Sequence, residues 1–129
     1  MPGLVLDSGA VTYLADTSTD DARALIAVFA SEDLWPPRVP SVVLTECLTG
    51  HPQKDARTNK FLKGCEVTTV LTESAARRAA KLRTAAGRGS AVDAALVALA
   101  EPGGLILTGD RHDLTALAAN AMGVTIEAI

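Results

Sequence analysis

The chain has 129 residues, of which 48% are hydrophobic and 3% aromatic, and its formal net charge at pH 7 is −3. This length suits one domain with a single hydrophobic core, and we expect residues 1–129 to form it. The scarcity of aromatic side chains argues against modules that bind nucleic acid by stacking bases on rings. The core must instead consist of Ala, Val, Leu and Ile.

Positive charge is concentrated in one part of the sequence. Nine of the twelve Lys and Arg lie between Lys54 and Arg88, against three Asp and Glu, so this segment carries a net charge of +6 and the rest of the chain −9. We therefore expect a basic band that faces an acidic centre.

The two cysteines and the first residues bear on where the protein is found. Cys47 and Cys65 form no CxxC pair and no spacing typical of a metal site, so we expect reduced thiols in a cytoplasmic protein. The start Met1-Pro2-Gly3 lacks the basic region and apolar segment of a signal peptide. No apolar run is long enough to cross a bilayer.

Along the chain, apolar runs alternate with helical periodicity. Gly3–Asp7 predicts a buried strand that ends on an acid, and a helix over Ser8–Leu14 follows directly. Thr17–Asp21 supply caps for a second helix that ends near Ser31. The side chains expected on the inner face of this helix are Ala24, Leu25, Val28 and Phe29.

The middle of the chain is rich in prolines and then in basic residues. For Leu34–Pro40 we expect a short edge strand, because prolines exclude a central one. Ser41 is the expected N-cap of a helix over Val42–Leu48. Gln53–Lys63 predicts a basic amphipathic helix, and the β-branched residues of Glu66–Leu71 predict a third strand.

The last part predicts a long helix over Thr72–Ala86, ended by glycines, and a helix capped by Ser90 and ended by Pro102–Gly104. Leu105–Thr108 is a short apolar run, as expected of a central parallel strand. The final elements expected are a helix over Asp113–Ala119 and a strand over Val124–Ile126. This alternation predicts an α/β fold, a three-layer α/β/α sandwich with a central, mainly parallel sheet.

Acidic residues at strand ends and helix starts are the candidates for chemistry. Asp7 and Asp110 each follow a predicted strand, where ligands bind in open α/β sheets. Asp93 lies early in a helix, and Glu46 lies in an apolar turn where an unpaired charge costs stability. Simpler explanations exist: Asp110 is an N-cap, and Asp93 pairs with Ser90 in a capping box. These explanations leave the joint placement of the four acids unexplained.

The four acids, if they converge, need a compensating charge. Two unit charges about 5 Å apart repel by roughly 3 kcal/mol at an effective dielectric constant near 20. A cluster of oxygen ligands without His or Cys favours a hard divalent ion, Mg²⁺ or Mn²⁺. Such an ion activates water and holds phosphate oxygens, so the cluster predicts hydrolysis of phosphodiester bonds.

Four motifs carry a resemblance to a known family. They are LVLDSGAV at Leu4–Val11, PSVVLTECL at Pro40–Leu48, SAVDAALVALA at Ser90–Ala100 and LILTGDRHDL at Leu105–Leu114. Together they resemble PIN-domain ribonucleases, in particular VapC-type toxins of type II toxin-antitoxin systems, over nearly the whole chain. The sequence departs from the family at Gly109, where Arg is common, and at Leu114, where an aromatic residue is common. Neither change removes a ligand.

The resemblance implies a PIN-like fold, dependence on Mg²⁺ or Mn²⁺, cleavage of RNA, a homodimer and a VapB-type antitoxin as partner. The residues that match the family's catalytic and metal-binding acids are Asp7, Glu46, Asp93 and Asp110. The residues at its supporting polar positions are Ser8, Thr108 and Asp113. Helix capping and a favourable interaction with the helix dipole are simpler explanations for these three.

Roles for the acids follow as hypotheses. We expect direct metal contacts from Asp7 and Asp93, and a direct or water-mediated one from Asp110. Glu46 would interact with metal-bound water or with the attacking water. Basic residues considered for contact with the RNA backbone are Arg77, Arg78, Lys81, Lys54 and Arg57. A solvated helix face is the simpler explanation for most of them.

Of three alternative functions, the first fails on its residues and the other two stay open. Asp7 would suit an aspartyl-phosphate phosphatase, but Gly9 stands where enzymes that resemble haloacid dehalogenases need a second Asp. A PIN-like module that only binds a partner has no use for four carboxylates that repel one another. A housekeeping PIN nuclease outside a toxin-antitoxin system would use the same residues. We expect no catalytic role for His51 or His112.

Overall fold

The structure is a computed structural model that describes residues 3–129, so the expectation for Met1 and Pro2 lies outside the described residues. Five strands form one sheet in the order β3-β2-β1-β4-β5, and every pairing is parallel. The strands are β1 (Leu4–Leu6), β2 (Arg38–Pro40), β3 (Glu66–Thr68), β4 (Leu105–Thr108) and β5 (Thr125–Ala128).

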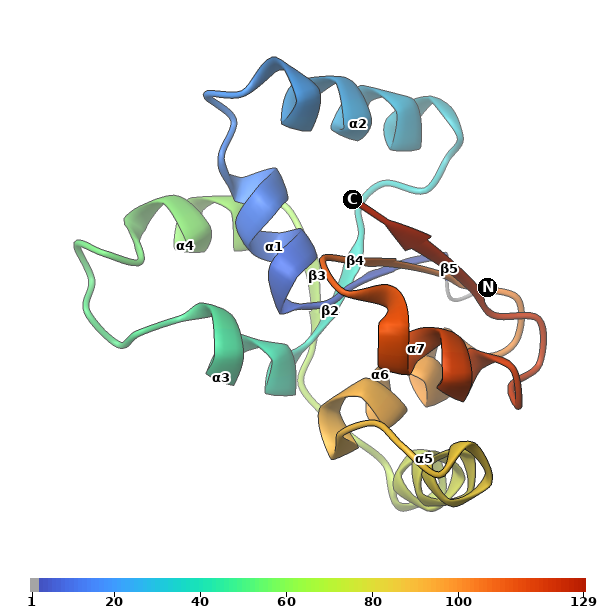
Figure 1. Ribbon diagram of the computed structural model, residues 1–129. Helices are drawn as coiled ribbons and strands as arrows, with labels where there is room; N and C mark the ends of the chain where they lie inside the picture. The colour runs from blue at the N-terminus through green and yellow to red at the C-terminus, as the bar shows by residue number, and fades with distance from the viewer. Residues whose placement is uncertain (1–2) are drawn as a thin grey trace.

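Helices cover both faces of the sheet, as the alternation of elements predicts. The right-handed crossover that is general for parallel strands predicts the helices between β1 and β3 on one face and those between β3 and β5 on the other. In Figure 1, α1, α2 and α4 lie above and to the left of the sheet, and α5 and α6 lie below it. The helices are α1 (Ser8–Ala15), α2 (Asp20–Ser31), α3 (Leu44–Cys47), α4 (Ala56–Leu62), α5 (Glu73–Ala86), α6 (Ala91–Ala100) and α7 (Arg111–Ala118).

The direction in which the chain builds the sheet reverses between β1 and β4. From β1 the chain moves outward through β2 to β3, and then returns to the other side of β1 to form β4 and β5. In open parallel sheets, ligands bind at such a reversal, outside the carboxyl ends of the strands. Asp7 directly follows β1, and Asp110 follows β4 after one residue. The topology therefore puts two of the predicted acids on either side of this position.

The core is aliphatic, as the composition predicts. All three residues of β1 are buried, and so are Ile106 and Leu107 of β4. Burial of both central strands on both faces explains why their sequences are continuous apolar runs without alternation. Cys47 and Cys65 are free thiols. Within residues 3–129, no helix combines the length and the apolar character needed to span a membrane.

Predicted caps delimit the helices of the second half. The Thr72 hydroxyl accepts a hydrogen bond from the backbone N–H of Ala75, at 3.1 Å, at the start of α5. At its end, Gly87 has a φ of 68°, a left-handed conformation that favours glycine. The Ser90 hydroxyl accepts from the Asp93 N–H at 3.0 Å and so caps α6, as predicted.

The inner face of α2 differs from the prediction. Ala24 is exposed, and Val28 keeps 48% of its surface exposed. The side chains that face the core are Ala22, Leu25, Ile26 and Phe29. This set has the i, i+3, i+4, i+7 spacing of one helical stripe, whereas Ala24 and Val28 lie on the adjacent face.

Two predictions around the prolines are wrong. β2 is an interior strand between β1 and β3 rather than an edge strand. The prolines permit this position because Pro36 and Pro37 precede the strand. Its last residue, Pro40, lies beyond the residue that pairs with β1. Ser41 is not an N-cap: it begins a short 3₁₀ turn, Ser41–Val43, whose start has no side-chain cap, and α3 follows only at Leu44.

Two further elements are shorter than predicted. β3 ends at Thr68, which leaves Val70 and Leu71 exposed. α4 starts at Ala56 because a buried carboxylate organises the preceding loop. Asp55 accepts hydrogen bonds from the backbone N–H groups of Thr49, at 3.0 Å, and Gly50, at 2.9 Å.

Replacing Asp55 with Asn is expected to lower the melting temperature by roughly 5 °C at pH 7, since the amide offers one acceptor oxygen in place of two. The hydrogen bond from the Thr49 backbone, opposed by burial, holds the pKa of Asp55 below its ordinary value. This stabilisation is present above the pKa of the unfolded chain and is lost as pH falls through the folded value. Melting curves between pH 7 and pH 3 should converge for the two proteins. Asp21→Asn, at an exposed helix position, is the control, and parallel curves for Asp55→Asn would contradict the account.

Candidate active site

A buried threonine links the acids that follow the two central strands. Thr108 is fully buried at the end of β4. Its hydroxyl donates to Oδ2 of Asp7 and accepts from the backbone N–H of Asp110 at 2.9 Å. The other carboxylate oxygen of Asp7, Oδ1, accepts from the Ala10 N–H at 2.8 Å and caps α1. Thr108 therefore fixes the rotamer of Asp7 and the backbone that presents Asp110.

Two glycines allow the same two segments to approach closely. A Cβ atom on Gly9 would lie 3.1 Å from the Cα atom of Gly109, tighter than ordinary packing. The start of α1 and the end of β4 are therefore in direct backbone contact beside the Asp7 carboxylate. Figure 1 shows α1 and the turn into α7 starting next to each other at this edge of the sheet.

Asp93 is half-buried in the first turn of α6. Burial raises the pKa of its carboxyl group, and the negative charges of Asp113 and Glu46 raise it further, against hydrogen bonds from Ser90. The structure thus brings Asp93 within electrostatic reach of acids from two other elements, α3 and α7. Of the predicted capping box, the hydrogen bond from the Asp93 N–H to the Ser90 hydroxyl is present.

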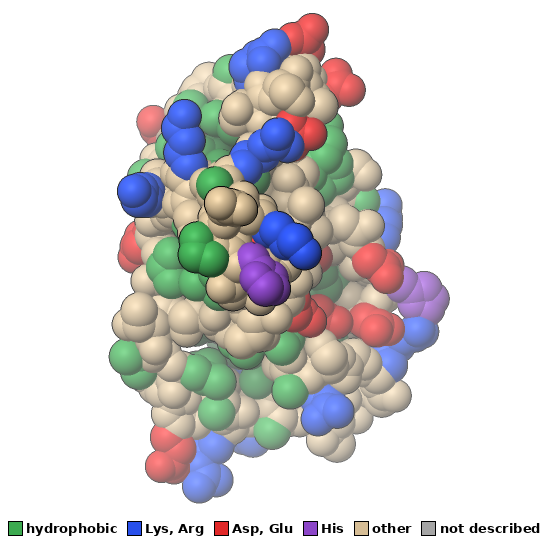
Figure 2. Space-filling model, turned by 90° about the vertical axis from the view of Figure 1, so that its left-hand side faces the viewer, with side chains coloured by type: hydrophobic (Ala, Val, Ile, Leu, Met, Phe, Trp, Pro, Cys, Tyr) green, Lys and Arg blue, Asp and Glu red, His purple; other side chains and the backbone are tan. Residues whose placement is uncertain are grey.

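The remaining acids lie at the surface of this region. Glu46 is exposed on α3, which packs against α1. Asp110 is exposed and caps α7 by accepting from the His112 N–H at 3.1 Å. On the face in Figure 2, a group of Asp and Glu side chains lies next to Lys, Arg and His side chains. Glu46 and Asp110 are therefore accessible from solvent at the sheet edge.

The simpler structural explanations and the functional one are compatible here. Asp7 and Asp110 cap α1 and α7, and Asp93 lies in the first turn of α6, which Ser90 caps. An ionised carboxylate has about four acceptor positions on its two oxygens, so a capping hydrogen bond leaves acceptors free. Capping therefore fixes these side chains without using up their capacity to bind a cation.

The chemistry of the donors fits a hard divalent ion, because the edge offers only oxygen atoms. Within residues 3–129, however, no group of three Asp, Glu, His or Cys side chains is arranged so that it could hold a metal ion. Carboxylates that have no cation between them repel one another by roughly 3 kcal/mol at 5 Å. Side-chain rotations would have to bring the acids onto a common ion.

Ser8 does not occupy the supporting role that the sequence suggests. It is the first residue of α1 and is half-buried. In the part of the chain that the structure describes, its hydroxyl makes no hydrogen bond to a carboxylate, and Thr108 makes that contact to Asp7 instead.

The basic residues considered for RNA contact are scattered. Arg77 pairs with Glu73 on the exposed face of α5, and Lys81 is exposed on the same helix. Lys54 and Arg57 border a groove beside α1, where Arg57 lies 3.3 Å from Asp16. Arg78 makes a bidentate ion pair with Glu101, at 2.8 and 2.7 Å, at the opposite end of α6 from Asp93.

We expect Arg78→Gln to destabilise the protein clearly more than Arg77→Gln does, because the Glu101 side chain is 5% exposed and would lose its charged partner. Glu101 also accepts from the Met122 N–H at 2.8 Å, so the pair holds α5, the end of α6 and the following loop together. Arg77→Gln, which removes an exposed i, i+4 pair, should cost under about 0.5 kcal/mol. Urea unfolding of the two variants measures the difference, and equal stabilities would refute the structural role of Arg78.

Sequence reasoning did not single out Arg88. Its Nε donates to Oδ1 of Asp113 at 2.8 Å, and its Nη2 lies 2.7 Å from Nδ1 of His112. The only local signal is its place in the glycine-flanked loop just before the Ser90 cap. His112 is exposed, as expected.

Comparison with known proteins gives structural neighbours only. No family model matches the sequence, and no curated protein matches it. A chain of VapBC2 from Rickettsia felis, bound to a promoter DNA fragment, superposes with a TM-score of 0.72 at 15% identity, covering 98% of each chain. A chain of DNA-bound VapBC from Salmonella typhimurium gives a TM-score of 0.72 at 17% identity, covering 99% of this chain and 98% of that one.

These neighbours share the fold along nearly the entire length of both chains. The protein therefore has the PIN-like α/β/α fold that its four motifs predict, with a wholly parallel sheet. The neighbours belong to VapBC complexes, which agrees with the resemblance to VapC-type toxins. At 15–17% identity the likeness establishes the fold, and function has to be argued from the site.

Proposed function

We propose that this chain is a metal-dependent endoribonuclease that hydrolyses RNA phosphodiester bonds. One observation carries the proposal: Asp7 and Asp110 flank the reversal of the sheet and are joined through buried Thr108. Helix capping alone does not require a buried threonine hydroxyl that bonds both the Asp7 carboxylate and the Asp110 backbone N–H. The PIN-like fold supports the proposal, since it is shared with VapBC chains.

The acids would hold Mg²⁺ or Mn²⁺ through Asp7, Asp93 and Asp110, with Glu46 near a bound water. Bound there, the ion would supply Lewis-acid activation of the phosphodiester and of water. Thr108 orients Asp7 for this task, as groups behind a metal ligand commonly do. Glu46, exposed and close enough to influence Asp93, would orient and deprotonate the attacking water.

We further propose that the protein is the toxin of a type II toxin-antitoxin pair, with a VapB-type antitoxin as partner and a homodimer as its assembly. The support is that the two structural neighbours described above are chains of VapBC complexes bound to DNA. Expression of the chain alone should then arrest bacterial growth, and Asp93→Asn should relieve the arrest. Equal growth of both cultures would remove the toxin assignment and leave a housekeeping nuclease.

The nuclease proposal is tested with protein purified free of any partner. Total RNA and a DNA of matched sequence are incubated with Mg²⁺, with Mn²⁺ and with EDTA. We expect cleavage of RNA only, dependent on the metal and lost in Asp7→Asn. Asp21→Asn, which alters an exposed acid in the first turn of α2, is the matched control and should cleave normally. Absence of cleavage under every condition, with no effect of EDTA on stability, would favour a module that only binds a partner.

A further inference from the structure

The loop Gly87–Gly89 joins α5 to α6 and carries a cation to the acidic edge. Arg88 donates from Nε to Asp113 at 2.8 Å. Asp113 is one of the two acids whose charge acts on Asp93. Arg88 therefore contacts the outer side of the candidate active site through a fixed ion pair.

Arg88 retains donors for a second anion. A guanidinium has five N–H groups in a planar fork. One is engaged by Asp113 and one by Nδ1 of His112, and the side chain is 47% exposed. The guanidinium thus offers further N–H groups next to the acids, in the geometry that suits phosphate oxygens.

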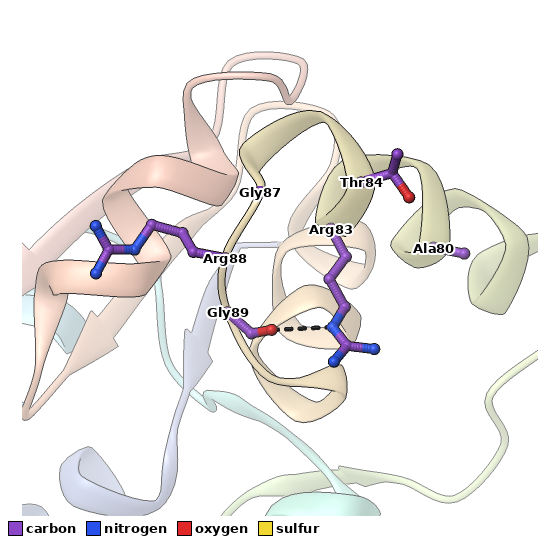
Figure 3. Close-up of a pocket in the computed structure, with 6 residues that line it drawn as sticks. All are labelled: Ala80, Arg83, Thr84, Gly87, Arg88 and Gly89. Atoms are coloured by element: carbon purple, nitrogen blue, oxygen red, sulfur yellow. Dashed lines mark hydrogen bonds between the residues drawn. The ribbon is translucent and has the colours of Figure 1, made fainter.

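A second guanidinium lies on the other side of the same loop. Arg83 donates from Nε to the carbonyl oxygen of Gly89 at 2.9 Å. Within residues 3–129 it has no carboxylate partner within 4.0 Å. Figure 3 shows Arg88 extending toward α7 and Arg83 bending beneath the loop beside Gly89. The pocket here has a volume of about 410 Å³ and is lined by Ala80, Arg83, Thr84, Gly87, Arg88 and Gly89.

Other arginines form ion pairs away from the acidic edge. Arg77, Arg78 and Arg57 pair with carboxylates that are not among the predicted site acids. An RNA strand that approaches the acidic edge meets electrostatic repulsion, so its phosphates need cations close by. Among the ion pairs of the described residues, only the one between Arg88 and Asp113 joins an arginine to a predicted site acid.

We propose that the α5–α6 loop is a phosphate clamp for single-stranded RNA, in which Arg88 binds the phosphate nearest the acids and Arg83 binds a neighbouring phosphate. This inference rests on the proposed ribonuclease function and specifies where the substrate backbone crosses the surface. The strand would run over the loop from α7 toward α5. The pocket beside Arg83 and Thr84 receives the second phosphate.

The test measures binding separately from cleavage. A fluorescein-labelled 12-nucleotide single-stranded RNA is titrated with Asp93→Asn protein in EDTA, and anisotropy is recorded at several salt concentrations. Adding Arg88→Gln or Arg83→Gln should weaken binding by about 10-fold each, and should lower the slope of log K against log salt by about 0.7 per lost phosphate contact. Arg23→Gln, which removes the same charge from α2, is the matched control and should leave both quantities unchanged. Melting curves check that each variant is folded.

Two results distinguish a failure of the phosphate clamp from a failure of the proposed nuclease function. If wild-type protein cleaves RNA while both loop variants bind RNA as tightly as the Arg23→Gln control, the clamp is wrong and the nuclease stands. If wild-type protein cleaves no RNA, the proposed function fails first. Arg88→Lys keeps the charge but loses the fork, so it should recover part of the salt slope and only part of the affinity. Full recovery of affinity would reduce the role of Arg88 to charge alone and overturn the fork geometry.

Discussion

Asp93→Asn should reduce kcat/KM for RNA cleavage by at least about 1,000-fold, because a residue expected to hold the ion would lose its charge. The fold should survive. Asn has the shape of Asp, and the hydrogen bond from the backbone N–H of this residue to the Ser90 hydroxyl is unaffected by the substitution. The measurement is single-turnover cleavage of a labelled RNA with Mg²⁺, beside thermal melting of both proteins.

The stability of the same variant discriminates between explanations. Burial and the charges of Asp113 and Glu46 raise the pKa of Asp93, so its ionised form is unfavourable in the folded protein above that pKa. Asparagine removes this cost, and Asp93→Asn should therefore melt at the same temperature as wild type or higher at pH 7. A variant that is inactive and also strongly destabilised would indicate a structural role for Asp93 and contradict the account.

Thr108→Val should lower cleavage by about 100-fold, because the hydroxyl positions Asp7, and groups behind metal ligands commonly contribute 10- to 100-fold. Valine has nearly the shape of threonine, but it leaves one Asp7 oxygen and the Asp110 N–H without their buried partner. The loss of these hydrogen bonds should also reduce the free energy of unfolding by about 1–3 kcal/mol. Initial rates across a range of Mg²⁺ concentrations test whether more metal is needed for half-maximal activity.

Thr108→Ser is the matched control for this effect. Serine keeps the hydroxyl and removes only a methyl group, so it should retain most of the activity and the metal dependence of wild type. The decisive comparison is Ser against Val at the same site. Equal activity of the two variants would show that Thr108 acts through packing, and would remove the structural link between Asp7 and Asp110 from the mechanism.

Local sequence signals predicted most of the elements that build the site. The apolar runs before Asp7 and before Gly109 are central parallel strands, as their lack of alternation indicates. The caps at Thr72 and Ser90 define the starts of α5 and α6. These signals succeed because strand burial and helix capping depend on residues that are close in sequence.

Features that depend on distant parts of the chain could not be predicted in this way. β2 is interior because β3 pairs with its outer side, a contact that the prolines around it do not reveal. Arg88 and Asp113 are separated by 25 residues and meet only when α7 packs beside the α5–α6 loop. The hydroxyl of Thr108 reaches Asp7 across two paired strands. Sequence alone also gave no preference between Thr108 and Ser8 for that contact.

The proposed activity requires that the acids of this edge form a cation site. Equilibrium titration of RNA-free protein with Mn²⁺, followed by the loss of free Mn²⁺ signal in electron paramagnetic resonance, measures this directly. We predict saturable binding to wild-type protein that is weakened at least about 10-fold in Asp7→Asn and in Asp93→Asn, and unchanged in Asp21→Asn. Wild-type protein that binds no Mn²⁺ at millimolar concentrations, or binds it as tightly after either substitution, would contradict the account.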